Sequence, residues 1–177
     1  MTKVRVLASM TFVYDPRQDR ILAAINAGRR EAWSCWLTRR VALSLLERAP
    51  ELLAKTSPLT PGTAAGIRSE IVAFERDAAI ATTSKAMRDT PTNVLETSAP
   101  AAELMEHLTI TPRKDCFSME LRGDGGGAAL GVLARVELHR ILQMLQAECA
   151  KAAWLVTPIK SPTPSVTENI RRKRVRH

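Results

Sequence analysis

No hydrophobic run in this sequence approaches the roughly 18 residues that a membrane-spanning helix needs. The N-terminal stretch Met1–Val6 also lacks the apolar core of a secretory signal peptide, which is about 7–15 residues long. The chain therefore predicts a cytoplasmic protein without a membrane span. Its 177 residues and apolar content of 45% are typical of a globular protein with a core of its own.

Metal ligands and paired cysteines are missing as well. The cysteines are odd in number and widely spaced, which argues against a disulfide framework and against a zinc knuckle; they are Cys35, Cys116 and Cys149. The three histidines show no ligand spacing to one another or to cysteine or carboxylate neighbours. We therefore expect no metal and no cofactor, and cysteines that pack as small hydrophobic residues.

The sequence carries no catalytic signature. No nucleophile–base pair and no carboxylate dyad stands out, although catalytic triads assemble from distant positions. The glycine-rich stretch 123–127 lacks a lysine and does not follow the strand–loop–helix order of phosphate-binding loops, so we interpret it as a hairpin turn. The expectation is a protein that is not an enzyme.

What the sequence does contain is an internal repeat at an offset of 96 residues. The stretch 16–19 (PRQD) matches 112–115 (PRKD), and 37–39 (LTR) matches 133–135 (LAR). The apolar positions between these stretches stay in register, and a strand shifted by one residue would turn every side chain to the other face. The pattern predicts an α+β fold with an internal duplication of a three-stranded antiparallel meander plus helix, the two units packed about a pseudo-twofold axis.

Patterning and turn residues place the elements of both units. The expected strands cover 10–14, 20–26, 33–37, 104–111, 116–122 and 128–133, with one helix after a Thr38 N-cap and another over 134–154. The expected division is a first unit over 1–56, a linker and bridging helix over 57–100, a second unit over 101–155 and a tail over 156–177.

The bridging helix is predicted over about 64–88, between the two units. Its apolar residues recur at helical spacing and form a seam, made of Ile67, Ile71, Phe74, Ala78 and Ala81. A continuous apolar seam must bury against the sheet or against a second chain. A homodimer through helix 64–88 is therefore one expectation for the partner.

The basic character of the chain is concentrated in its C-terminal tail. The segment from Lys160 to His177 holds six basic residues and one acidic residue, so it carries +5 of the net charge of +8 and leaves +3 for the rest. Prolines make the tail a disordered linker that ends in a basic cluster, namely Arg171, Arg172, Lys173, Arg174 and Arg176. Such a cluster attracts polyanions, nucleic acid in particular; the alternative is a tail that only solubilises the protein.

Aromatic residues are scarce and lie mostly in the first unit. Phe12, Tyr14, Trp33 and Trp36 correspond, 96 positions on, to Leu108, Ile110, Ala129 and Val132. Because Trp33 and Trp36 are three residues apart on one strand, they face opposite sides of the sheet. We expect one of these tryptophans to be exposed as a contact for a nucleic-acid base or a protein partner, although core packing is the alternative.

A charged pair also recurs in both units. Arg39 and Arg135 open the two predicted helices, and Asp19 and Asp115 lie at the two hairpin turns. A cation at a helix N-terminus opposes the helix dipole, so its recurrence calls for a reason. An ion pair that joins hairpin to helix within each unit is the simpler interpretation, and two symmetric arginines lining an anion site are the alternative.

The order of three strands and a helix, given twice, with the stretch 36–38 (WLT) leading into the first helix, resembles the Whirly and PUR-alpha groups of single-strand nucleic-acid binders. Those groups have four strands per unit where this sequence has three. The resemblance implies a sheet that binds nucleic acid. We expect a non-catalytic binding protein that contacts nucleic acid through the basic tail and one sheet surface; the alternative is a protein–protein adaptor or assembly factor that docks a partner through the helix seam or the exposed tryptophan.

Overall fold

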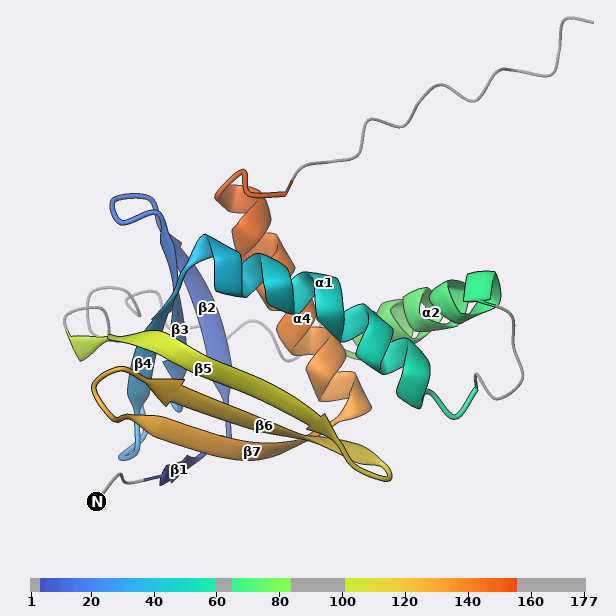
Figure 1. The fold of residues 1–177 in the computed structure, drawn as a ribbon, viewed down its shortest axis with the longest axis horizontal. Coiled ribbons are helices and arrows are strands. Elements are labelled where there is room, and N and C mark those ends of the chain that lie inside the picture. Colours follow the sequence, from blue (N-terminus) through green and yellow to red (C-terminus); the bar gives the residue numbers. More distant parts are fainter. Residues whose placement is uncertain (1–3, 60–64, 84–100, 156–177) are drawn as a thin grey trace, which may run out of the picture.

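In the described part of the chain, seven strands form one curled, mixed sheet, two helices pack against it and a third helix packs on those two (Figure 1). The computed structural model describes residues 4–59, 65–83 and 101–155. The predicted α+β class is confirmed. None of the helices among these residues is long and apolar enough to cross a membrane.

The strands form two antiparallel meanders that lie side by side in the sheet. The first contains β2 (Met10–Asp15), β3 (Arg20–Ile25) and β4 (Trp33–Leu37), and the second contains β5 (Glu103–Pro112), β6 (Cys116–Gly123) and β7 (Ala128–Ala134). All six strands were predicted to within about two residues at each end, the usual uncertainty of such boundaries. The short strand β1 (Val4–Val6) was not predicted.

The two ends of the sheet are joined by one continuous segment. The sheet order is β1-β7-β6-β5-β4-β3-β2, so β1 and β2 are at opposite ends although only residues 7–9 separate them. β1 pairs in parallel with β7, and β4 pairs in parallel with β5. The segment Val4–Asp15 therefore reaches from one end of the sheet to the other and holds it in its curled form.

The same register occurs twice at the offset of 96. Ile21 pairs with Leu37 between β3 and β4, and Phe117 pairs with Leu133 between β6 and β7. The parallel contacts also correspond. Cys35 is opposite Glu103, and the Cβ of Leu7 lies against Gly131. At the offset of 96, Cys35 matches Gly131 and Leu7 matches Glu103. A Cβ at position 131 would stand 2.7 Å from that of Leu7, so the close approach of these two strands requires glycine.

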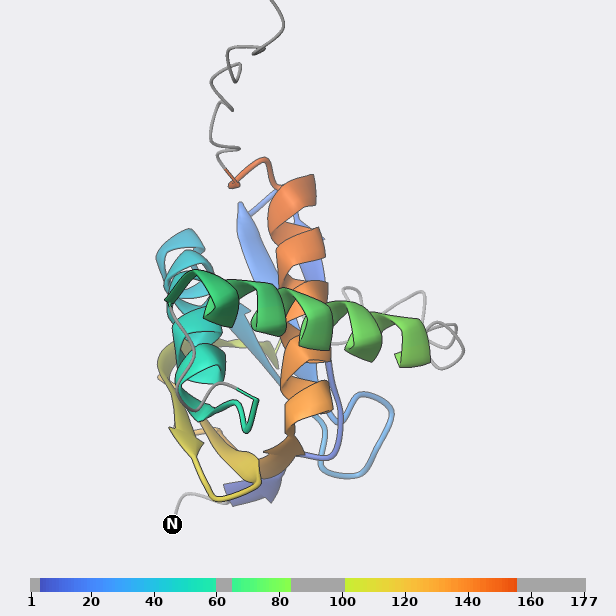
Figure 2. The ribbon, with the colours of Figure 1, turned by 90° about the vertical axis from the view of Figure 1, so that its right-hand side faces the viewer.

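The helices are α1 (Arg39–Thr56), α2 (Ala65–Thr83) and α4 (Arg135–Lys151). The Thr38 hydroxyl accepts a hydrogen bond from the Val41 amide at 3.4 Å, as the predicted N-cap requires. α1 and α4 follow the two meanders and cover the concave face of the sheet, and α2 crosses both of them (Figure 2). The main core lies between this face and α1 and α4, and Leu22, Ala24 and Trp36 form a smaller cluster on the opposite face.

Asn26 holds the corner at which the chain turns from β1 into β2. Its side-chain oxygen accepts hydrogen bonds from the amides of Ala8 (3.0 Å) and Ser9 (3.1 Å), and its side-chain nitrogen donates to the Val6 carbonyl oxygen (2.7 Å). The residue is buried and has a φ of 52°, a left-handed conformation that asparagine tolerates better than most residues. One side chain thus satisfies three backbone groups of the segment that joins the two ends of the sheet.

Replacing Asn26 is expected to weaken this corner strongly. Asn26→Ala removes three hydrogen bonds and adds strain at positive φ, so the free energy of unfolding should fall by about 2–4 kcal/mol in urea denaturation. Asn26→Gly removes the same hydrogen bonds without the strain and should be the less destabilised variant. An Asn26→Ala protein as stable as the wild type would show that the corner does not depend on this side chain.

Candidate functional site

The basic cluster of the tail lies outside the described residues, which end at Leu155. The predicted contacts of Arg171, Arg172, Lys173, Arg174 and Arg176 with a polyanion therefore stay a prediction.

The expectation of an exposed tryptophan is wrong, because both candidates are buried. Trp33 is 7% exposed and lies in the main core, with the Arg5 guanidinium 5.9 Å from its ring centre. Trp36 is 5% exposed and lies in the smaller cluster on the other face of the sheet. The two rings do face opposite sides, as their spacing requires. The sheet is covered on both sides at β4, so neither ring is available to a partner.

Arg135 forms a structural ion pair, but with α2 instead of the hairpin of its own unit. Its guanidinium donates to Glu75 Oε2 (3.1 Å), to the Leu53 carbonyl oxygen (3.0 Å) and to Thr56 Oγ1 (2.8 Å), and it stacks 5.5 Å from the centre of the Phe117 ring. Asp115 is exposed and has no such contact. The predicted pairing of Arg135 with its hairpin is therefore corrected, since Glu75 on the bridging helix takes that place.

Glu75 connects Arg135 to two further groups. Its Oε1 accepts from the Ser57 hydroxyl (2.8 Å), and its Oε2 lies 3.6 Å from His139 Nε2. Burial lowers the pKa of His139 against the opposing influence of Glu75, which favours the neutral imidazole. We call Arg135, Glu75, His139, Thr56 and Ser57 the Arg135 cluster; it joins the end of α1, the middle of α2 and the start of α4.

The matching residues of the first unit have other roles. The Asp19 carboxylate accepts hydrogen bonds from the Tyr14 hydroxyl (2.9 Å) and from Trp154 Nε1 (3.0 Å), which ties the β2–β3 hairpin to the end of α4. Arg39 is exposed and forms no ion pair with any described residue. Arg39 opens α1 at the solvent surface while Arg135 is held in its cluster, so the structure does not bring them together as one anion site.

Most of the apolar seam of the bridging helix faces solvent, although Ile71 is half-buried. Phe74 is 71% exposed and Ile67 is 49% exposed, and Ala78 and Ala81 are exposed as well. The side of α2 that packs on the other helices carries Val72, Glu75 and Ala79 instead. Of the two expectations for the seam, burial against the sheet is therefore wrong for Ile67 and Phe74, while burial against a second chain stays a prediction.

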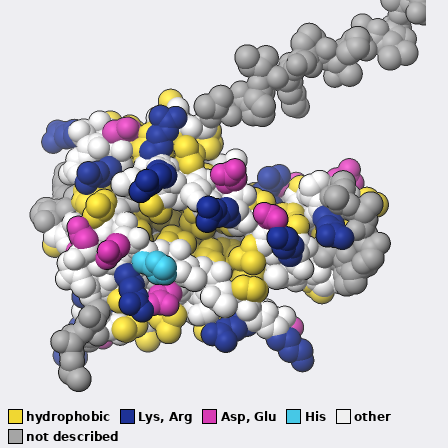
Figure 3. Space-filling view, in the orientation of Figure 1, with side chains coloured by type: hydrophobic (Ala, Val, Ile, Leu, Met, Phe, Trp, Pro, Cys, Tyr) yellow, Lys and Arg dark blue, Asp and Glu magenta, His cyan; other side chains and the backbone are white. Residues whose placement is uncertain are grey.

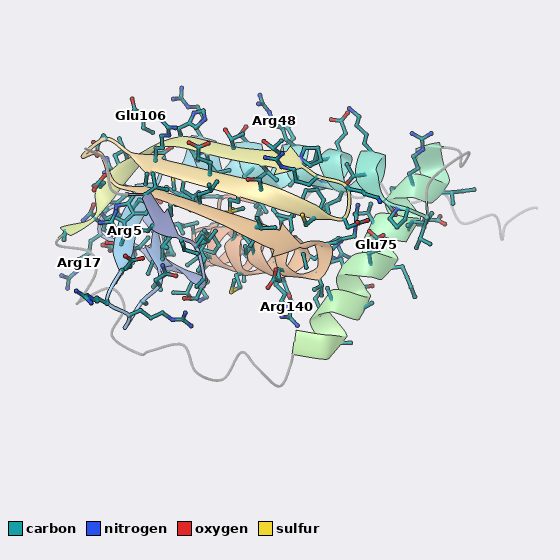
Figure 4. All side chains as sticks on the ribbon, turned by 90° about the horizontal axis from the view of Figure 1, so that it is seen from below. Arg5, Arg17, Arg48, Glu75, Glu106 and Arg140 are labelled. Carbon is teal, nitrogen blue, oxygen red and sulfur yellow. The ribbon has the colours of Figure 1, made fainter. Side chains whose placement is uncertain are left out.

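A groove runs between α1 and β5. It has a volume of about 580 Å³ and is lined by Arg40, Val41, Ser44, Leu45, Arg48, Ala49 and Leu52 of α1 and by residues 105–110 of β5. The space-filling view shows an apolar hollow in the middle of this face, bordered by basic side chains together with some acidic ones and a histidine (Figure 3). Arg48 of α1 and Glu106 of β5 both extend from this face (Figure 4).

The groove has a counterpart in the other half of the molecule, and that counterpart is filled. There, α4 packs directly on β2, and the aromatic ring of Tyr14 meets Trp154 edge-on at 5.8 Å. At the offset of 96, Phe12 and Tyr14 are replaced by Leu108 and Ile110, and Leu145 of α4 corresponds to Ala49 of α1. Smaller side chains thus line the α1–β5 groove. The scarcity of aromatic residues in the second unit was visible in the sequence, but its consequence required the packing of the helices.

The described residues contain no group of side chains that is arranged to hold a metal ion. Cys35 and Cys149 are buried, and burial raises the pKa of the Cys149 thiol to about 11, so it is not a nucleophile at neutral pH. These thiols act as core residues.

No protein family, no curated protein and no solved structure matches this chain. The resemblance to the Whirly and PUR-alpha groups therefore rests on the order of elements alone. The candidate sites are the α2 seam and the α1–β5 groove, and both are defined by their geometry.

The Arg135 cluster is expected to carry much of the stability of the helical layer. Arg135→Met leaves Glu75 largely buried without its cation, so the free energy of unfolding should fall by about 2–4 kcal/mol in urea denaturation. The matched control is Arg39→Met, at the equivalent and exposed position, which should change stability by less than about 0.5 kcal/mol. Equal effects of the two substitutions would contradict the role of the cluster.

Proposed function

We propose that this protein is a non-catalytic binding protein, an adaptor or assembly factor that docks a protein partner through the α2 seam. The observation that carries the proposal is the exposure of Phe74 and Ile67 along one side of a well-packed helix. Single exposed apolar residues are ordinary, but two large ones, Ile67 and Phe74, exposed on the same side of one helix are typical of an interaction surface.

The packing of α2 supports this proposal. Glu75 is held by Arg135 and by the Ser57 hydroxyl, and Val72 packs against the main core. These contacts fix the rotation of the helix about its axis and so direct Phe74 outward. A preformed helix face loses little conformational entropy when a partner helix packs on it.

The charges beside the seam favour a different protein over a second copy. Glu70 and Asp77 are exposed and lie seven residues apart on one side of the seam. In an antiparallel pair of α2 helices these flanks would face each other, and like charges at such positions repel. A partner helix with basic residues beside its apolar stripe would instead be attracted. The homodimer through helix 64–88 is the alternative that the experiment below separates.

Site-specific photo-crosslinking tests the α2 seam. Benzoylphenylalanine in place of Phe74 should give covalent adducts in the cells that make the protein, and the same group in place of the exposed Gln18 should not. An adduct of twice the chain mass would assign the seam to a homodimer. Ile67→Asp should reduce the adducts at least about tenfold without lowering stability, because Ile67 is exposed. Equal labelling from positions 74 and 18 would contradict docking at the seam.

Nucleic-acid contact is the second candidate function. Arg39, Arg40 and Arg48 lie on α1 without an ion pair to any described residue, and the sequence adds the basic tail. These cations would attract a phosphate backbone. The burial of Trp33 and Trp36 removes the base-stacking surface that the sequence suggested, so this candidate now depends on charge alone.

A salt series separates the two candidates. Fluorescence anisotropy should show that full-length protein binds a labelled single-stranded oligonucleotide, with affinity falling about 100-fold between 50 and 200 mM salt if five cations meet phosphates. A chain ending at residue 156 should lose most of this binding if the tail supplies it. Binding that survives truncation would place a site on the arginines of α1, and no binding by either chain would exclude nucleic acid as the partner.

A further inference from the structure

Among the described residues, no strand pairs with the edge of β5 that faces the α1–β5 groove beyond Leu104. β4 contacts β5 only at Cys35 opposite Glu103 and Trp36 opposite Leu104. β4 then ends at Leu37 and the chain turns into α1, so residues 105–112 of β5 have β6 as their one neighbouring strand within the described residues. An unpaired strand edge is a template for another strand.

The hydrogen-bond pattern identifies the free backbone groups. The Arg113 amide donates to the Cys116 carbonyl oxygen at 2.8 Å, which directs the backbone groups of Arg113 toward β6. In an antiparallel ladder these directions alternate, so Thr109 and Thr111 also bond to β6. The amides and carbonyls of Leu108 and Ile110 therefore point to the other side of β5, toward the groove.

The corresponding edge in the first meander is closed by α4. The Tyr14 amide of β2 donates to the Glu148 carboxylate at 2.9 Å, and Trp154 packs on the Tyr14 ring. At the offset of 96, the position of Glu148 is taken by Leu52, whose side chain has no hydrogen-bond acceptor. Within the described residues, α1 therefore offers the Ile110 amide no side-chain acceptor at the position that Glu148 has on α4.

The opposite side of the groove carries positive charge. Arg40 and Arg48 lie eight residues apart on α1, both line the groove, and neither forms an ion pair with a described residue. The lining also includes apolar residues, Leu45 and Leu108 among them, and the β5 side carries Glu106 and His107. An occupant that matches the free strand edge, the apolar lining and the two arginines has free backbone amides, apolar side chains and carboxylates.

We propose that the α1–β5 groove binds an extended acidic peptide segment of a protein partner, which adds as a strand to the free edge of β5. Alternate residues of such a segment point to opposite sides, so apolar side chains enter the groove while acidic ones reach Arg40 and Arg48. The site is separate from the α2 seam, so it also stands if the seam binds nothing.

Peptide binding to the full-length protein tests the proposal. A labelled six-residue peptide that alternates valine and aspartate should bind, and one that alternates valine and lysine should not. The valine–aspartate peptide with N-methylated amides keeps its charges but cannot complete a strand ladder, so it should bind at least about tenfold more weakly. Failure of the unmodified acidic peptide to bind at millimolar concentration overturns the proposal.

Variants and amide exchange locate the bound peptide. Arg40→Glu with Arg48→Glu should weaken binding at least about tenfold, whereas the same charge change at the exposed Arg29 and Arg30, in the turn between β3 and β4, should not. Hydrogen exchange should slow at the Leu108 and Ile110 amides and stay unchanged at Thr109 and Thr111.

Three results would argue against strand addition. Peptide binding without protection of the Leu108 and Ile110 amides would overturn it. So would a thymidine oligonucleotide that binds as tightly as the peptide and needs the same arginines, because nucleic acid has no amides to extend a sheet. Loss of peptide binding in Phe74→Ala would move the site to the α2 seam and overturn the assignment to the groove.

Discussion

The guanidinium group of Arg135 determines how the helical layer is arranged on the sheet. It holds the last turn of α1 through Leu53 and Thr56 and the middle of α2 through Glu75, while its own helix, α4, is packed on β2. Both candidate sites depend on this arrangement. The rotation of α2 that exposes Phe74 is set by Glu75, and the position of α1 beside β5 is set at its C-terminal end. The cluster is largely buried, and a buried charge without its partner is costly. The packing of the three helices on one another is therefore cooperative.

Small differences between two similar halves created the groove. We infer that the meanders descend from one duplicated unit, and the inference is supported by the shared register of Ile21–Leu37 and Phe117–Leu133 at the offset of 96. In one half, Trp154 packs on the Tyr14 ring and closes α4 onto β2. The other helix faces smaller residues. The same backbone arrangement can therefore leave a crevice filled in one half and open in the other. The volume of the side chains decides whether the helix packs directly on the strand.

The sequence was informative wherever local pattern determines structure. Period-two alternation located six strands, and Thr38 located the start of α1. β1 was missed because three residues are too short for a pattern. The exposure of a tryptophan was misjudged because the sequence shows that a residue is apolar but not which surfaces cover it. For the same reason, the sequence left open whether the α2 seam packs on the sheet or on a second chain. Arg135 was recognised as a structural cation, but its partner Glu75 lies 60 residues away on a helix whose placement no local pattern predicts.

An unpaired strand edge can bind a partner, but it can also pair with the sheet of another molecule and cause aggregation. The groove limits this aggregation. α1 stands beside the free edge of β5, so a whole sheet cannot approach it, whereas one extended segment can enter. A second copy of the chain would bring its own Arg40 and Arg48 toward the same charges, which opposes pairing between two β5 edges. The same arginines attract an acidic segment. Selectivity in this groove therefore comes from repulsion of the wrong partner as much as from attraction of the right one.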